Sequence, residues 1–148
     1  MNKLTKPVND LKATYFGRGF DSHRLHQNVM LKQCKPKFIE NSSLPTWLSK
    51  ICPIDIWAIN LAFWVFCKGK MSKTTKRHET IHFQQQLEML FIFQWICYGI
   101  CWLIGLIKYG DGKKAYHQNP FEQEAYSNQR KYTYLKKRKR YSWVKYKI

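Results

Sequence analysis

The apolar residues of this chain are gathered in its middle, between two polar and basic ends. Residues 1–50 show few periodic signals, so we expect them to form short elements that wrap the core. From Ile54 to Cys67 the chain is rich in β-branched and aromatic residues, and both alternating sets are mostly apolar. This pattern predicts either a strand buried on each face or one strand of a hairpin pair.

The longest apolar run extends from Met89 to Ile107, with Gln94 as its only strongly polar residue. A straight helix of this length rises about 28 Å, which is enough to cross a bilayer. Two structures fit the run. One is a straight membrane span, and the other, which we favour, is a bent helical segment that is buried in a core or dips into a membrane. Gly99 and the region just past Glu88 are the expected break points.

A short motif with metal-binding spacing precedes this run. Residues His78-Glu79-Thr80-Ile81-His82 form an HExxH segment, for which Ser72 or Thr74 is the expected helix cap. Residues four apart lie on one face of a helix, so both imidazoles can bind one metal ion, with Glu79 beside them. The spacing predicts a zinc hydrolase site, and the alternative is an exposed helical turn with a polar face.

A catalytic zinc ion needs a third protein ligand. Asn119-Pro120 predicts the start of a new helix, which carries Glu122 and Glu124 in its first turns. These two carboxylates point away from each other, so only one can face a metal. Glu122 also occupies the position of a capping-box residue, whose carboxylate would reach back to the cap N–H. Glu122 as ligand, Glu122 as cap and Glu124 as the alternative ligand therefore all remain open.

The HExxH segment followed by a Glu three residues before Ala125 resembles the gluzincin metallopeptidases, in particular the membrane proteases with a Glu-x-x-Ala-Asp third-ligand helix. It is more similar still to small, uncharacterised bacterial and phage HExxH proteins that carry a later FExEAY segment and a basic tail. The resemblance covers the chain from Ile56 onward. Tyr126 stands where the membrane proteases have Asp, so the supporting role of that Asp does not carry over.

The resemblance implies a site and a reaction. Its metal ligands would be His78, His82 and Glu122, and its general base would be Glu79. A Zn²⁺ ion held there would activate water for attack on a peptide carbonyl, and Glu79 would remove the proton. Candidate helpers that stabilise the transition state are Tyr116, His117 and Tyr126. Gln85 and Gln86, one turn past His82, are either supports of the metal ligands or part of a solvated face.

Length and element types define the expected architecture. The chain has 148 residues, which is enough for one domain with a modest core. We expect a mainly helical α+β fold: an HExxH helix after a short strand or hairpin, a bent apolar helical segment, and a third helix with the Glu ligand. Within the single domain 1–148, residues 1–50 are peripheral, 54–131 form the metallopeptidase-like core, and 132–148 form a basic tail.

The net charge of +17 favours anionic partners. An anionic membrane surface is the expected partner besides a peptide or protein substrate, and nucleic acid is a weaker alternative. The block Lys136–Arg140 is either a partner site or a set of cations near a helix end. No apolar signal segment opens the chain, and its five cysteines have no framework spacing, so we expect a cytoplasmic or membrane-associated protein facing the cytosol.

Three classes of function are consistent with these features. The first is a zinc metallopeptidase, which acts at a membrane surface in one version of the hypothesis. The second is a basic accessory protein that binds nucleic acid or membrane and has a degenerate or structural metal site. The third is a small single-span membrane protein without metal.

Overall fold

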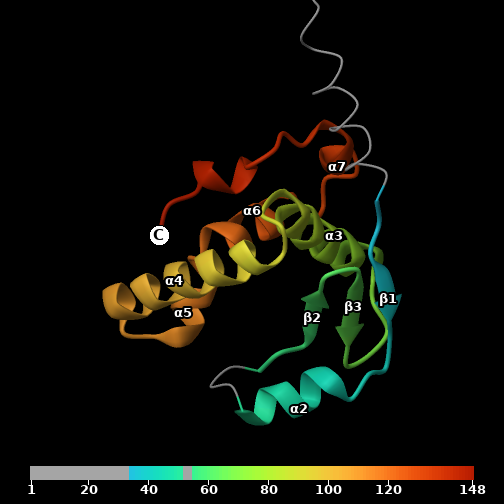
Figure 1. Cartoon of the computed structure of the whole chain (residues 1–148), viewed down its shortest axis with the longest axis horizontal. Helices are drawn as coiled ribbons and strands as arrows, with labels where there is room; N and C mark the ends of the chain where they lie inside the picture. Colours follow the sequence, from blue (N-terminus) through green and yellow to red (C-terminus); the bar gives the residue numbers. More distant parts are fainter. Residues whose placement is uncertain (1–33, 52–54) are drawn as a thin grey trace, which may run out of the picture.

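The fold is α+β and mainly helical, as predicted. The computed structural model describes residues 34–51 and 55–148, so residues 1–33 of the predicted wrapping segment lie outside the described part. A small sheet and α2 lie on one side, and the remaining helices lie on the other (Figure 1). In chain order the described elements are β1 (Lys37–Ile39), α2 (Leu44–Ile51), β2 (Ala58–Leu61), β3 (Trp64–Cys67), α3 (Lys73–Glu88), α4 (Ile92–Tyr109), α5 (Gly112–His117), α6 (Pro120–Asn128), α7 (Tyr134–Lys137) and the 3-10 helix η1 (Ser142–Lys145).

The apolar segment before the HExxH motif folds as a hairpin. β2 and β3 pair antiparallel, with Asn60 opposite Val65, and β3 also pairs in parallel with β1. The sheet order is therefore β1-β3-β2. Val65 and Cys67 are fully buried, whereas Trp64 is 46% exposed. The hairpin prediction is confirmed, and the alternative of one strand buried on both faces is wrong, because the chain turns at Ala62 with a positive φ of 51°.

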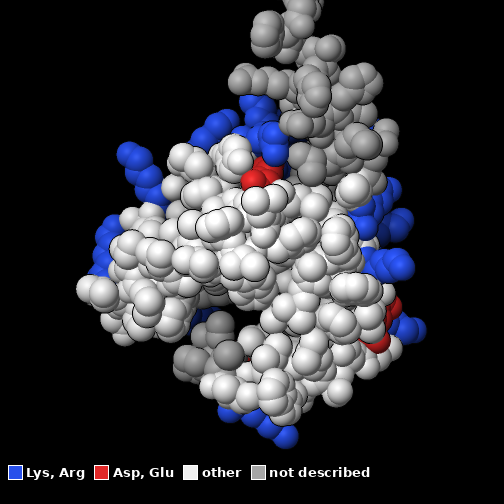
Figure 2. All heavy atoms as spheres, viewed as in Figure 1, with Lys and Arg blue, Asp and Glu red and all other residues white. Residues whose placement is uncertain are grey.

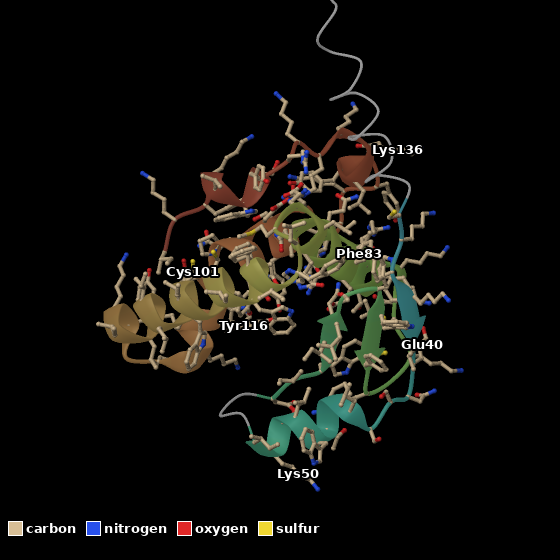
Figure 3. All side chains as sticks on the ribbon, viewed as in Figure 1. Glu40, Lys50, Phe83, Cys101, Tyr116 and Lys136 are labelled. Atoms are coloured by element: carbon tan, nitrogen blue, oxygen red, sulfur yellow. The ribbon has the colours of Figure 1, made fainter. Side chains whose placement is uncertain are left out.

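Helix α3 begins and ends at local signals. Ser72, rather than Thr74, is the N-cap, and its hydroxyl accepts a hydrogen bond from the Thr75 N–H. At the other end, the N–H of Met89 bonds to the carbonyls of Gln85 and Gln86. Phe83 is fully buried and points from α3 into the interior (Figure 3). The helix is thus fixed between the sheet and the other helices, which leaves little freedom to its two histidines.

The long apolar run bends immediately after α3. Leu90 and Phe91 have positive φ angles of 51° and 59°, and α4 starts at the next residue. The predicted break just past Glu88 is therefore confirmed, while Gly99 lies inside α4 and is not a break. From Ile92 onward the run is one uninterrupted helix, so the straight alternative holds for that part, but it does not extend back to Met89, because the N–H of Phe91 bonds back to Gln86 and closes α3. Within the described residues, α4 is the one helix long and apolar enough to cross a membrane.

The chain then returns along α4. Gly110 ends α4 in the left-handed conformation, and the Asp111 carboxylate caps α5. A Cβ at Gly105 would lie 3.1 Å from Ala115, so the glycine is what allows α4 and α5 to pack this closely. Asn119, the predicted N-cap of α6, also donates from its amide to the carbonyl of Tyr98 on α4. This bond ties the start of α6 to α4, and α6 itself packs against α3.

The end of the chain folds back onto α3 and α6. Arg138, which is 5% exposed, forms ion pairs with Glu88 and Glu124. Neither sequence interpretation of the block Lys136–Arg140 accounts for this residue. Two buried carboxylates need a counter-charge, and one member of the block supplies it from inside the protein.

Candidate metal centre

The HExxH helix brings its two histidines together as its spacing predicts. His78 and His82 lie one turn apart on α3, and their Nε2 atoms are 3.1 Å from each other. Both residues are buried, at 7% and 8% exposure. The alternative of an exposed polar turn is wrong, since this face of α3 packs against α6.

Glu122 of α6 completes the group. Its Oε1 lies 3.3 Å from His82 Nε2, and its Oε2 lies 3.4 Å from His78 Nε2. In a tetrahedral zinc site with bonds of 2.0–2.1 Å, neighbouring ligand atoms are about 3.3 Å apart. The three residues are buried and within metal-ligand distance of one another, so they could hold a metal ion.

The chemistry of the three donors also fits a cation. His82 Nδ1 lies 2.8 Å from Gln85 Oε1, an amide oxygen that can only accept. The proton of a neutral His82 ring is therefore assigned to Nδ1, which leaves the lone pair on Nε2 facing His78 and Glu122. Glu122 Oε2 is buried and has no hydrogen-bond partner among the described residues. Two ring nitrogens and a carboxylate thus converge on one place, where a bound cation would balance the charge of the carboxylate.

The pKa values of His82 and Glu122 also indicate that this group favours an added positive charge. Burial would lower the pKa of His82, but the Glu122 carboxylate outweighs it and raises this pKa to about 9. Burial would raise the pKa of Glu122, but His82 and His78 hold it well below its usual range. The carboxylate therefore stays ionised and attracts either a proton onto His82 or a metal ion in its place.

Glu79 is a carboxylate of a different kind. It is 8% exposed, and burial raises its pKa, while the nearby histidines offset part of that effect. Its backbone carbonyl accepts a hydrogen bond of 3.0 Å from the Asn60 amide, which ties this turn of α3 to β2. A carboxylate that is held beside two imidazoles and has a raised pKa is suited to taking up a proton.

Gln85 fixes the orientation of His82. It is fully buried, and its Nε2 donates both to the Phe121 carbonyl at 3.1 Å and to Glu124 Oε2 at 3.0 Å. Its amide oxygen is therefore held toward the His82 ring. Gln85 thus supports a candidate metal ligand, and it does not lie on a solvated face of the helix. Gln86 is buried too, but its amide bonds to the Asn60 carbonyl on β2.

Glu124 does not belong to the group formed by His78, His82 and Glu122. Its carboxylate accepts hydrogen bonds from Gln85, Tyr134 and Arg138. Glu122, not Glu124, is thus the residue of α6 that meets the histidines. The capping-box position of Glu122 is not used, because the recorded partners of its carboxylate are the two histidines and Tyr98.

Aromatic residues form another wall of the group. The Tyr126 ring is 4.6 Å from the His78 ring, and His117 and Tyr116 lie next to Tyr126, at 5.4 and 6.5 Å between ring centroids. Tyr116 points from α5 toward the space beside the sheet (Figure 3). Burial raises the pKa of both tyrosines, so they keep their protons and remain hydrogen-bond donors. All three predicted helpers therefore lie on the His78 side of the group.

Tyr98 was missed by the sequence analysis. Its hydroxyl donates to Glu122 Oε1 at 3.0 Å. It lies in the apolar run, where it is one of several aromatic residues. The available signal was its spacing from Gln94, four residues earlier, because both residues fall on the inward face of α4.

Comparisons with known proteins do not extend these observations. No family model, no curated protein and no solved structure matches the chain. The resemblance to gluzincin metallopeptidases therefore stays a prediction.

Replacing Gln85 by leucine is expected to weaken the binding of a metal ion at this group by about 10–100-fold, because His82 loses the acceptor that fixes its ring. Competition with a chromophoric chelator measures the affinity. Gln86→Leu is the matched control, since it removes a buried amide from the same helix that does not contact the histidine. Equal losses in the two variants would mean that the effect is a general one on folding.

Proposed function

We propose that this protein is a zinc-dependent metallopeptidase with His78, His82 and Glu122 as metal ligands. The observation that carries the proposal is that the two Nε2 atoms lie 3.1 Å apart in a buried site, and that each lies 3.3 or 3.4 Å from one of the two Glu122 oxygens. Two histidines and one carboxylate are typical of catalytic zinc sites, which keep a fourth position open, whereas structural sites are usually closed by four protein ligands rich in cysteine. Zinc bound there would supply a Lewis acid that polarises a carbonyl and makes water acidic.

The residues around the group have complementary tasks in this proposal. Glu79 accepts a proton from the attacking water and then delivers it to the leaving amine, for which its raised pKa is suited. Tyr126, with Tyr116 and His117 beside it, supplies a donor to the oxygen of the attacked carbonyl. Gln85 holds His82, and Tyr98 holds Glu122.

The edge of the sheet favours a peptide as the substrate. Within the described residues β2 pairs only with β3, and the Asn60 carbonyl is bonded to the Gln86 amide, so the part of the outer edge before Asn60 remains for pairing. Asn60 of β2 forms two hydrogen bonds with α3: its side-chain amide donates to the Glu79 carbonyl, and its backbone carbonyl accepts from the Gln86 amide. Figure 2 shows a hollow between the α4–α5 hairpin and the part of the molecule built from the sheet and α2. An extended peptide lying there would pair with β2 by main-chain hydrogen bonds and pass beside α3.

Metal removal tests the proposal directly. The purified protein is expected to contain about one zinc ion per chain and to cleave unfolded polypeptides. Treatment with 1,10-phenanthroline should abolish cleavage, and added Zn²⁺ should restore it. Atomic emission measures the metal, and mass spectrometry of the products identifies the broken bonds. Full cleavage by metal-free protein would contradict the proposal.

Substitution of the ligands separates Glu122 from Glu124. His78→Ala and Glu122→Ala are expected to lose most of the zinc, because two remaining ligands hold the ion weakly. Glu124→Gln, which keeps the shape of a side chain bonded to Gln85 and Arg138, should retain it. Zinc retained by Glu122→Ala and lost by Glu124→Gln would move the third ligand by two residues along α6.

A further inference from the structure

Helix α4 carries a continuous apolar face that nothing in the described part of the chain covers. Its large side chains recur at spacings of three and four residues, and each is at least 51% exposed: Ile92, Ile96, Ile100, Leu103 and Ile107. The opposite side of the same helix is bound to the protein. Gln94 and Gly105 are buried there, and Trp102 donates from its indole N–H to the carbonyl of Gly112. One side of α4 therefore packs against the rest of the protein, and the other side exposes only apolar side chains.

The apolar face continues beyond the helix. At the bend before α4, Leu90 is 70% exposed and Phe91 packs on Phe63 of the hairpin turn, with 5.3 Å between ring centroids. Leu90 and Phe91 both adopt positive φ, which is a strained conformation for large side chains. Phe63 and Trp64 are themselves 47% and 46% exposed. Exposed apolar patches of this extent mark interaction sites in soluble proteins.

Charge identifies the kind of partner. From Ile92 to Ile107 the sequence of α4 contains no charged residue, and Lys108, Lys113 and Lys114 follow at the exposed tip of the α4–α5 hairpin. Figure 2 shows the same arrangement on a larger scale: a broad face without charged side chains, with Lys and Arg gathered around its edge. A second copy of this chain, also at +17, would be repelled. Lipids with anionic headgroups instead attract the cationic edge while their acyl chains accept the apolar centre.

We propose that the α4 face, defined as Leu90, Ile92, Ile96, Ile100, Leu103 and Ile107, docks onto the surface of an anionic lipid bilayer. The helix lies along the surface and does not cross it, because its inner side is occupied by α5 and by the bond from Tyr98 to Glu122. The same bond ties the docking helix directly to the candidate metal centre. The site would then act next to the membrane, on peptide segments that emerge from it or lie on it. Docking itself does not depend on the proposed peptidase activity.

Co-sedimentation of the full chain with lipid vesicles tests the proposal. The protein is expected to bind vesicles made of equal parts phosphatidylcholine and phosphatidylglycerol, and to bind pure phosphatidylcholine much more weakly. The double variant Ile100→Glu and Ile107→Glu should reduce binding to the anionic vesicles by about 10-fold or more, since it places charges where hydrocarbon must be buried. Circular dichroism and zinc content should match those of the wild type.

The control keeps the change in charge and moves it off the face. Ile51→Glu with Val144→Glu alters two side chains that are 64% and 61% exposed outside the α4 face, so binding should change little. Equal losses in the two double variants would show that net charge alone drives binding and would overturn the proposal. No binding by the wild type, or a dimer in light scattering that only the α4 variant dissociates, would overturn it as well. Glu79→Gln should bind vesicles like the wild type, which separates docking from catalysis.

Discussion

Replacement of Glu79 by glutamine is expected to leave zinc bound while peptide cleavage falls by about 10²–10⁴-fold. The amide keeps the size and shape of the carboxylate, and the three proposed ligands are untouched. It cannot accept a proton from water, so the reaction loses its base and the acid that later protonates the leaving amine. Initial rates of cleavage of a defined peptide, together with the zinc content of each sample, measure the two effects separately.

Glu40→Gln is the control for this result. Glu40 forms an ion pair with Lys76 and accepts a hydrogen bond from the Met71 N–H, so the variant makes the same chemical change away from the metal group. Its cleavage rate should stay within a factor of about 2 of the wild type, since isolated surface pairs contribute little. An active Glu79→Gln protein would remove Glu79 from the mechanism. Loss of zinc in Glu79→Gln would show that this residue supports the ligands.

The local parts of this fold could be predicted because each depends on neighbours in the sequence. The HExxH spacing fixes which residues share a face of α3, and Ser72 and Asn119-Pro120 mark helix starts through bonds to the next few residues. The hairpin was predicted only as one of two alternatives, because its turn at Ala62 and Phe63 contains neither glycine nor proline. The bend after Glu88 also lacks glycine and proline, so no local pattern indicates it, and only the need to bring Glu122 back to the histidines favours it.

The supporting contacts of the site could not be predicted, because they join distant segments. Nothing local distinguishes Tyr98 from the other aromatic residues of the apolar run, and nothing distinguishes Arg138 from the lysines beside it. What these contacts share is a buried polar chain: Arg138 binds Glu124, Glu124 binds Gln85, and Gln85 binds His82. Such a chain is stable only if each member has its partners. The tail thereby becomes part of the scaffold of the candidate metal centre.

Replacing Arg138 by methionine is expected to lower the free energy of unfolding by about 3–5 kcal/mol. Methionine fills much of the same space, but Glu88 and Glu124 would then lie buried without their counter-charge. Burial would lower the pKa of the arginine, but the hydrogen bonds that it donates to both carboxylates outweigh this effect and raise the pKa, so Arg138 is charged throughout the usual pH range. Urea unfolding followed by circular dichroism measures the loss, and zinc affinity should fall too, since Glu124 holds Gln85.

Neutralising the stranded carboxylates should recover much of this stability. In the triple variant Arg138→Met, Glu88→Gln and Glu124→Gln no buried charge is left, and replacing a whole buried ion network in this way is often close to neutral. The two glutamines can still meet Tyr134 and the N–H of Tyr141, which bond to the carboxylates in the native protein. A triple variant as unstable as Arg138→Met would show that the guanidinium acts through its packing and its geometry of donors. Recovery would show that Arg138 stabilises the protein mainly through its charge. One residue of the strongly cationic tail would then serve to neutralise two buried carboxylates.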